Sequence, residues 1–416
     1  MDKRIPHYMW KHSGYSPCMS ILSLRARSLV EIGEDKKLCM QRILMAFGRE
    51  IVKRENKNEP CQRSRLWNHE EALDVLNKGK GTKKVEALGL KFADRSERNI
   101  ISFQCDQFND LQNLRFLDLD RADIQADINA CILGEFRNHF LRLRWLGWQG
   151  TPLRFDIKSL QLNLQNLVIL DLSGSQELRV LEEWNGWELI LNARKLKVLK
   201  LTGCTRLNST PKFPDSLGLK RLILEGCSGL AAIDSSIHNL HKLVSLNMKG
   251  CSFLCKMPDL GSIKGLKELV IDETSISKIE FHKDSMRKLK FLSARNCENL
   301  TEISDLIKYL ESLKYLSLDG SKIKTLPESI GSLAKMKTLS LKNCRRLTTL
   351  PDGIGRLSSL QLLDLSDTAI KKLPTSVKDL KATKVLRGTF IQEQDFPETT
   401  LNSENLVEIN VSYARN

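Results

Sequence analysis

A six-residue phrase, Leu-x-x-Leu-x-Leu, recurs through most of this chain and restricts what it can fold into. Residues 196–201, 219–224 and 243–248 are successive copies, the last ending in methionine. The second leucine of the phrase occupies positions 117, 146, 170, 199, 222, 246, 269, 292, 316, 339 and 363, with weaker copies at Leu386 and Ile409. Steps of 23, 24 or 29 residues indicate a stacked array of short units.

Within each copy, apolar residues alternate as in a strand with one buried face. Leu199 and Leu201 share one face, whereas Val198 and Lys200 share the other. One repeat buries three or four large apolar side chains, worth about 5–10 kcal/mol, which is less than the entropy cost of ordering its residues. The pattern therefore predicts an α/β leucine-rich-repeat solenoid, a horseshoe, over about residues 111–411, with a parallel sheet on its concave side.

Small polar side chains follow the phrase at a fixed position. They are Cys204, Cys227, Cys251, Cys297 and Cys344, with Thr274, Ser321 and Thr368 in other repeats. We expect them to turn inward and bond the backbone where each strand ends. Zinc binding by these cysteines is the alternative, but the paired C-x-x-C spacing of zinc sites is missing. His238 and His241, near Cys251 and Cys255, are interpreted as two surface histidines in contact with solvent. No metal site is predicted.

The charge is uneven along the 416 residues. Of the net +15, residues 1–84 hold 18 Lys/Arg and 10 Asp/Glu, so a basic head precedes a nearly balanced body. No apolar run is long enough for a membrane span, and no signal peptide follows Met1. Eleven scattered cysteines fit free thiols in a reducing compartment, so we expect a soluble chain of the cytoplasm or nucleus.

Six consecutive repeats place charges of alternating sign on the outward row after the last strand leucine. They are Glu225, Lys249, Asp272, Arg295, Asp319 and Lys342. Neighbouring strands lie about 4.8 Å apart, so each charge is expected to face an opposite one, as a structural charge ladder. A row neutralised in this way argues against nucleic acid on the concave face.

The outward column before the second strand leucine is apolar in several repeats. Its candidates for a protein contact are Phe116, Trp145, Ile169 and Val198, then Phe291 and Tyr315. Exposed aromatic side chains are typical binding hot spots, so this column is our predicted protein-binding surface. The alternative is local packing under loops of the 29-residue steps.

The head is expected to be helical. Apolar residues at near-helical spacing predict one helix within 37–53 and a short one over 70–76. Leu66, Trp67 and Phe47 are expected to be core anchors.

Sequence motifs in the repeats and in the head resemble those of a known family. Residues 326–331 and 350–355 (Leu-Pro-x-x-Ile-Gly) and 373–374 (Leu-Pro), with 48–56, 64–67 and 81–88 in the head, are similar to plant intracellular immune receptors of the TIR-type nucleotide-binding leucine-rich-repeat class. The resemblance implies a C-terminal portion without the TIR domain and most of the nucleotide-binding module. It divides the chain into 1–84, a winged-helix-like end plus linker, and 85–416, the solenoid without an evident C-terminal cap.

No bound cofactor and no enzymatic activity are expected. The family's winged helix carries Met-His-Asp, whereas here Met40 is followed by Gln41 and Arg42, and no phosphate-binding G-x-x-x-x-G-K-[ST] is present. No nucleophile–base motif is evident either.

The leading hypothesis is a disease-resistance-like recognition protein. Its repeats would bind a pathogen effector or the nucleotide-binding domain of a receptor in defence signalling. The alternative is a leucine-rich-repeat substrate adaptor of a ubiquitin ligase. Because the sequence ends within a repeat, we expect its last strand to be an edge at which copies of the chain could associate.

Overall fold

The computed structural model describes residues 4–12, 14, 16–33, 38–91, 103–120, 132–133, 135–149, 161–175, 188–283, 285–388 and 408–411. The chain forms two compact units. Unit 1 is Met1–Cys204 with Ser216–Leu219, and unit 2 is Thr205–Asp215 with Lys220–Asn416.

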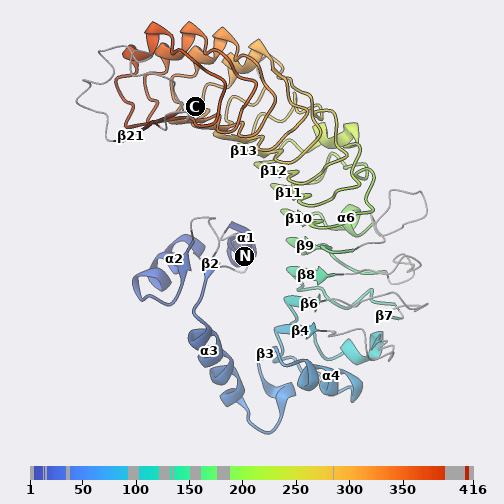
Figure 1. Ribbon diagram of the computed structural model, residues 1–416. Helices are drawn as coiled ribbons and strands as arrows, with labels where there is room; N and C mark the ends of the chain where they lie inside the picture. The colour runs from blue at the N-terminus through green and yellow to red at the C-terminus, as the bar shows by residue number, and fades with distance from the viewer. Residues whose placement is uncertain are drawn as a thin grey trace. The chain divides into compact units, whose positions relative to one another are not determined.

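Unit 1 begins with helices and a small antiparallel pair of strands. These are α1 (Arg4–His12), α2 (Pro17–Ala26), β1 (Glu31–Ile32), β2 (Leu38–Cys39) and α3 (Arg42–Glu55) (Figure 1). β1 and β2 pair as antiparallel strands. The helix expected within 37–53 starts at Arg42, because residues 38–39 pair with β1 instead. No residue of α3 is buried, and Phe47 is 60% exposed, so its prediction as a core anchor is wrong.

The sheet of unit 1 starts inside the predicted head. After η1 (Pro60–Gln62), strand β3 (Arg65–Leu66) pairs in parallel with β4 (Ala87–Lys91), and α4 (His69–Asn77) lies between them in sequence. Asn68 caps α4, and Leu76 is fully buried with Leu66. The boundary predicted at residue 84 therefore does not separate two cores, because β3 and α4 share the apolar interior of the first repeat.

Four further parallel strands follow β4 in unit 1. They are β6 (Phe116–Asp120), β8 (Trp145–Trp148), β9 (Ile169–Asp171) and β10 (Val198–Lys200). Leu88, Leu117, Leu146, Leu170 and Leu199 stand side by side in register. Leu88 extends the series one repeat before the first predicted copy. The remaining elements are β5 (Phe103–Gln104), η2 (Cys105–Phe108), β7 (Ile132–Leu133) and α6 (Glu188–Asn192).

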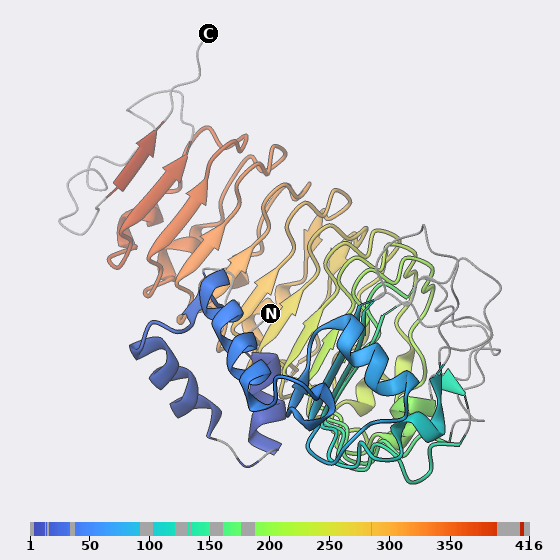
Figure 2. The ribbon, with the colours of Figure 1, turned by 90° about the horizontal axis from the view of Figure 1, so that it is seen from below.

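Unit 2 carries the most regular repeats. Its strands are β11 (Arg221–Ile223), β12 (Ser245–Asn247), β13 (Glu268–Val270), β15 (Phe291–Ser293), β17 (Tyr315–Ser317), β18 (Thr338–Ser340), β19 (Leu362–Leu365), β20 (Val385–Gly388) and β21 (Glu408–Val411). Figure 2 shows these strands running side by side in parallel. Every predicted second leucine from Leu222 to Ile409 lies in one of them. The leucine-rich-repeat fold is thus confirmed.

The returning segments of unit 2 are short 3-10 turns and one small strand pair. They are η4 (Ser235–Asn239), η5 (Asp305–Tyr309), η6 (Glu328–Ser332), η7 (Asp352–Arg356) and η8 (Thr375–Asp379), with β14 (Lys278–Ile279) paired to β16 (Glu302–Ile303). Leu246, Leu269 and Leu292 are fully buried between this layer and the sheet. Each such side chain contributes about 1.5–3 kcal/mol.

Candidate protein-binding surfaces

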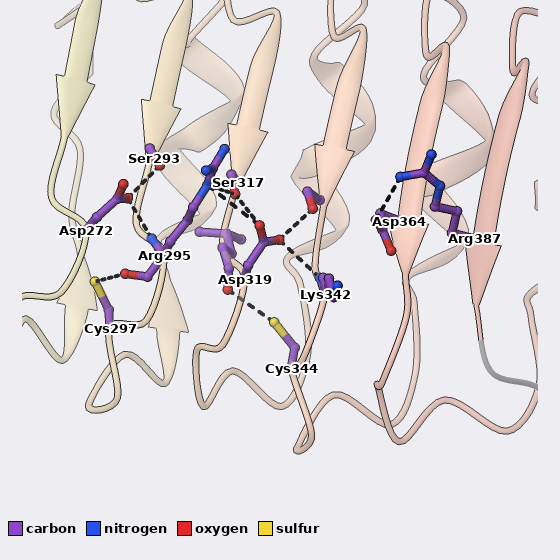
Figure 3. A network of polar contacts seen from close by, with 12 residues as sticks. Asp272, Ser293, Arg295, Cys297, Ser317, Asp319, Lys342, Cys344, Asp364 and Arg387 are labelled. Carbon is purple, nitrogen blue, oxygen red and sulfur yellow. Dashed lines mark hydrogen bonds and ion pairs between the residues drawn. The ribbon is translucent and has the colours of Figure 1, made fainter. Parts of the chain in front are cut away.

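The outward row after the strand leucines of unit 2 is a network of polar contacts (Figure 3). Asp272 accepts hydrogen bonds from the Ser293 hydroxyl at 2.5 Å and from the backbone N–H of Arg295 at 2.8 Å. The Arg295 guanidinium Nε lies 3.6 Å from Asp319 Oδ2 and donates to Ser317 Oγ at 2.9 Å. Strand-end carboxylates therefore hold neighbouring repeats together.

This network differs from a ladder of charged side chains alone. Arg295 and Asp319 form the expected ion pair, but Lys249 pairs with Glu273 at 3.5 Å, and Glu225 accepts from the Asn247 amide at 3.2 Å. Asp319 also receives the Ser340 hydroxyl at 2.5 Å and the backbone N–H of Lys342 at 3.1 Å. The aspartate side chain is short, so its carboxylate reaches the hydroxyl and the backbone N–H of the next strand more readily than it reaches the ammonium group at the end of a long lysine side chain.

Three aromatic residues form an aromatic row on the sheet of unit 1. The rings of Phe116 and Trp145 stack with centroids 5.2 Å apart, and Trp67 packs edge-on to Phe116 at 5.4 Å. Phe116 is half-buried and Trp67 is 38% exposed. Trp67, which was expected in the core, thus belongs to this surface. The sequence position of Trp67, directly after Leu66 at the end of strand β3, could have indicated that its side chain lies on the surface.

The indole of Trp145 has an unsatisfied donor. Trp145 is 6% exposed, and its Nε1 has no hydrogen-bond partner among the described residues. A buried indole N–H usually finds an acceptor. Next to it, a Cβ added to Gly147 would lie 2.0 Å from the Asp118 carboxylate, so only glycine fits at that position.

Ile169 and Val198 are fully buried, which differs from their expected place on an open contact surface. In unit 1, α1 contacts β9, the strand that carries Ile169, and Ile5 of α1 is 3% exposed. Neither aliphatic side chain is therefore available to a partner at the surface of unit 1.

Phe291 and Tyr315 lie on adjacent strands of unit 2. They are paired in register on β15 and β17, and their ring centroids are 6.3 Å apart. Tyr315 is 44% exposed and Phe291 is half-buried. The same column continues to Glu268 on β13 and Thr338 on β18, so the aromatic pair has polar neighbours.

A cavity of about 420 Å³ opens beside the aromatic row of unit 1. Trp67 and Phe116 line it, together with Trp10 of α1 and Leu24 of α2. Its wall also carries Arg115 and Glu86, whose side chains lie 3.9 Å apart. An apolar wall with a few charged groups suits a side chain of a bound protein.

The cysteine positions are structural. The Sγ of Cys204, Cys251, Cys297 and Cys344 donates to a carbonyl oxygen of the preceding repeat at 3.0–3.4 Å, which confirms their expected inward orientation. Thr274 and Thr368 bond a carbonyl three residues back, at 2.8 and 2.9 Å. In the part of the chain that the structure describes, no group of three His, Cys, Asp or Glu side chains is arranged to hold a metal ion.

The remaining sequence predictions concern the head and the chain's end. Gln41 and Arg42 are exposed at the start of α3.

Every helix among the described residues is too short or too polar to cross a membrane. β21 pairs with β20, while residues 412–416 lie outside the described residues, so self-association through this edge stays a prediction.

Comparisons with known proteins identify relatives of the repeats. No family model matches the chain. Disease resistance protein RML1A of Arabidopsis thaliana is 33% identical over 223 residues, 52% of this chain and 20% of that protein. RPP2A of the same plant is 31% identical over 229 residues, and RPV1 of Vitis rotundifolia is 29% identical over 226. Half of this chain is homologous to plant disease resistance proteins.

This chain matches only a small share of the length of these relatives. The matched segments span 20%, 16% and 15% of RML1A, RPP2A and RPV1. Solved leucine-rich-repeat structures confirm the fold alone. The TLR13–ssRNA13 complex gives a TM-score of 0.63 at 16% identity over 84% of this chain and 48% of that chain. Leptospira interrogans LIC12759 gives 0.54 at 20% identity over 84% and 95%.

Proposed function

We propose that this chain is a disease-resistance-like, non-enzymatic recognition module whose repeats bind a protein, either a pathogen effector or the nucleotide-binding domain of a receptor. The observation that carries the proposal is the partly exposed Phe291–Tyr315 pair on the sheet of unit 2. Large rigid side chains gain contact area on binding at a small cost in conformational entropy. The proposal places the chain in the cytoplasm or nucleus of the plant cell.

The choice of a protein ligand rests on this chain's own side chains. The same fold occurs in the Toll–Spatzle complex, with a TM-score of 0.60 at 15% identity over 77% of this chain and 43% of that chain, and also in the RNA complex of TLR13. Here the strand-end carboxylates of Asp272, Asp319 and Asp364 stand on the face that a ligand would cover. Asp319 and Asp364 are paired with Arg295 and Arg387, so this row offers no uncompensated positive charge to a phosphate backbone, which favours a protein over a nucleic acid.

The test is quantitative binding of recombinant proteins. Candidates are pathogen effectors and the nucleotide-binding module of a related resistance protein, measured against wild type and the double variant Phe291→Ala/Tyr315→Ala. We expect at least a tenfold loss of affinity, about 1.4 kcal/mol, with little change in thermal midpoint because both rings are partly exposed.

The matched control is Phe253→Ala, which removes a ring that is 69% exposed outside the strands of unit 2. It should bind like wild type. Equal affinity of the double variant and wild type would reject the aromatic pair. The ubiquitin-ligase adaptor stays a prediction, and co-purification with a Skp-type adaptor is its test.

A further inference from the structure

A column of lysines lies at the beginning of four consecutive strands of unit 2. Each lysine directly follows the first apolar residue of the repeated phrase and precedes the strand by one position. We call Lys267, Lys290, Lys314 and Lys337 the lysine column. The same position carries Lys220 and Lys384 in other repeats of the unit.

Backbone hydrogen bonds fix the spacing of the column. The N–H of Lys290 donates to the carbonyl of Lys267 at 2.9 Å, Lys314 to Lys290 at 3.0 Å, and Lys337 to Lys314 at 2.8 Å. Adjacent parallel strands lie about 4.8 Å apart. Four positive side chains therefore start from neighbouring points along one edge of the sheet.

The charges of the column are not compensated within the described residues. None of the four ammonium groups there has a carboxylate within ion-pair distance, whereas the strand-end row binds its charges internally through Asp272 and Asp319. Lys267 and Lys290 are exposed, and Lys314 and Lys337 are half-buried. Like charges at this spacing repel, so the column does not serve the stability of the solenoid.

We propose that the lysine column is the docking edge for an acidic segment of a protein partner, laid across β13, β15, β17 and β18. The inference rests on the proposed function, and it adds the chemistry of the partner. Lysine is a point charge on a flexible stem, so it accepts carboxylates at varied spacing without fixed geometry. Such a surface selects a partner by its charge density.

The residues next to the column favour a peptide over a nucleic acid. Phe291 and Tyr315 directly follow Lys290 and Lys314, and they offer apolar contact for side chains between the acidic ones. The neighbouring position on β13 is Glu268, which lies 3.4 Å from the Arg221 guanidinium. This pairing compensates the charge of Glu268, so the preference for a peptide rests on the apolar contact that Phe291 and Tyr315 offer.

The test measures binding of a fluorescein-labelled glutamate decapeptide to the full chain by fluorescence anisotropy. We expect saturable binding at 20 mM salt that weakens about tenfold or more at 200 mM, since salt screens exposed charges. The variant Lys267→Gln/Lys290→Gln/Lys314→Gln/Lys337→Gln should lose at least tenfold in affinity.

The control variant is Lys324→Gln/Lys371→Gln/Lys372→Gln/Lys378→Gln. It makes the same change of net charge with exposed lysines outside the column, and should stay within about twofold of wild type. Equal losses in the two variants would overturn the column as a site. Tighter binding of a uridine decanucleotide than of the glutamate peptide would overturn the proposed partner class.

A second variant keeps the test independent of folding losses. Lys290→Glu/Lys314→Glu should gain affinity for a lysine decapeptide, and no gain would contradict the proposal. The proposed function is judged separately. If Phe291→Ala/Tyr315→Ala loses a protein ligand that the four-lysine variant retains, the recognition function stands and the acidic docking edge fails.

Discussion

Buried cysteines link successive repeats of unit 2 through hydrogen bonds to the backbone. Cys251 Sγ donates to the carbonyl of Leu224 at 3.2 Å, and Cys344 Sγ to that of Leu318 at 3.2 Å. Burial raises the pKa of the Cys251 thiol to about 12, with a further contribution from Cys227. Burial also raises the thiol pKa of Cys297 and Cys344. These thiols stay neutral and act as donors that keep carbonyl oxygens satisfied away from water.

Cys251→Ser should flatten the alkaline pH dependence of stability. The folded pKa of Cys251 is raised from 9.0 to about 12, so its contribution is present below pH 9 and is lost as pH rises toward 12. The hydroxyl can still donate to Leu224 but does not titrate in this range. Urea unfolding between pH 8 and 11 checks this. Exposed Cys255→Ser is the control, and parallel curves for wild type and Cys251→Ser would refute the assignment.

The 3-10 turns of unit 2 pack closely because glycines stand between them. A Cβ added to Gly353 of η7 would lie 2.4 Å from the Glu328 carbonyl oxygen of η6, and one added to Gly331 would lie 2.2 Å from the Gly353 oxygen. Glu328 also accepts the backbone N–H of Gly353 at 2.8 Å. The glycine that ends the Leu-Pro-x-x-Ile-Gly motif at Gly331 is thus explained by the close approach of neighbouring turns.

Gly353→Ala should destabilise unit 2 by about 1–3 kcal/mol, because the added methyl forces the two turns apart. Gly48→Ala is the matched control. Gly48 lies in α3 with nothing within 4 Å of an added Cβ, so alanine there should stabilise the helix by about 0.5–1 kcal/mol. Denaturant unfolding measures both changes, and equal effects of the same sign would contradict the packing argument.

Each repeat of the whole molecule is stabilised mainly by its neighbours. β13 pairs with β12 on one side and β15 on the other, and Leu269 is fully buried in register with Leu246 and Leu292. Stability of such an array is approximately a sum of repeat and interface contributions. Damage to one repeat should therefore stay local.

Leu269→Ala should cost about 2–5 kcal/mol and raise hydrogen exchange most in β12, β13 and β15. Exchange in β4 and β6 of unit 1 should change little. Leu191→Ala is the control, because this leucine is 50% exposed on α6. Hydrogen exchange read by mass spectrometry separates these strands, and a uniform rise across both units would argue against repeat-by-repeat stability.

The leucine period by itself determined the fold and its register. Leu117 to Leu199 and Leu222 to Leu386 align as the steps in sequence predict, including the 29-residue steps. The inward direction of the cysteines was also predictable. These features were predictable because the alternation of buried and outward side chains is set within a single repeat, and every repeat has the same local pattern.

Tertiary structure alone decided which outward residues are available. Phe116 and Tyr315 share one position of the phrase with Ile169 and Val198, yet the two aromatic side chains are partly exposed and the two aliphatic ones are fully buried. The pattern likewise did not place Trp67 beside Phe116 or give Asp272 a serine and a backbone N–H as partners. A period specifies the position of a residue within its repeat, whereas exposure depends on what other segments cover, and those contacts join residues far apart in the chain.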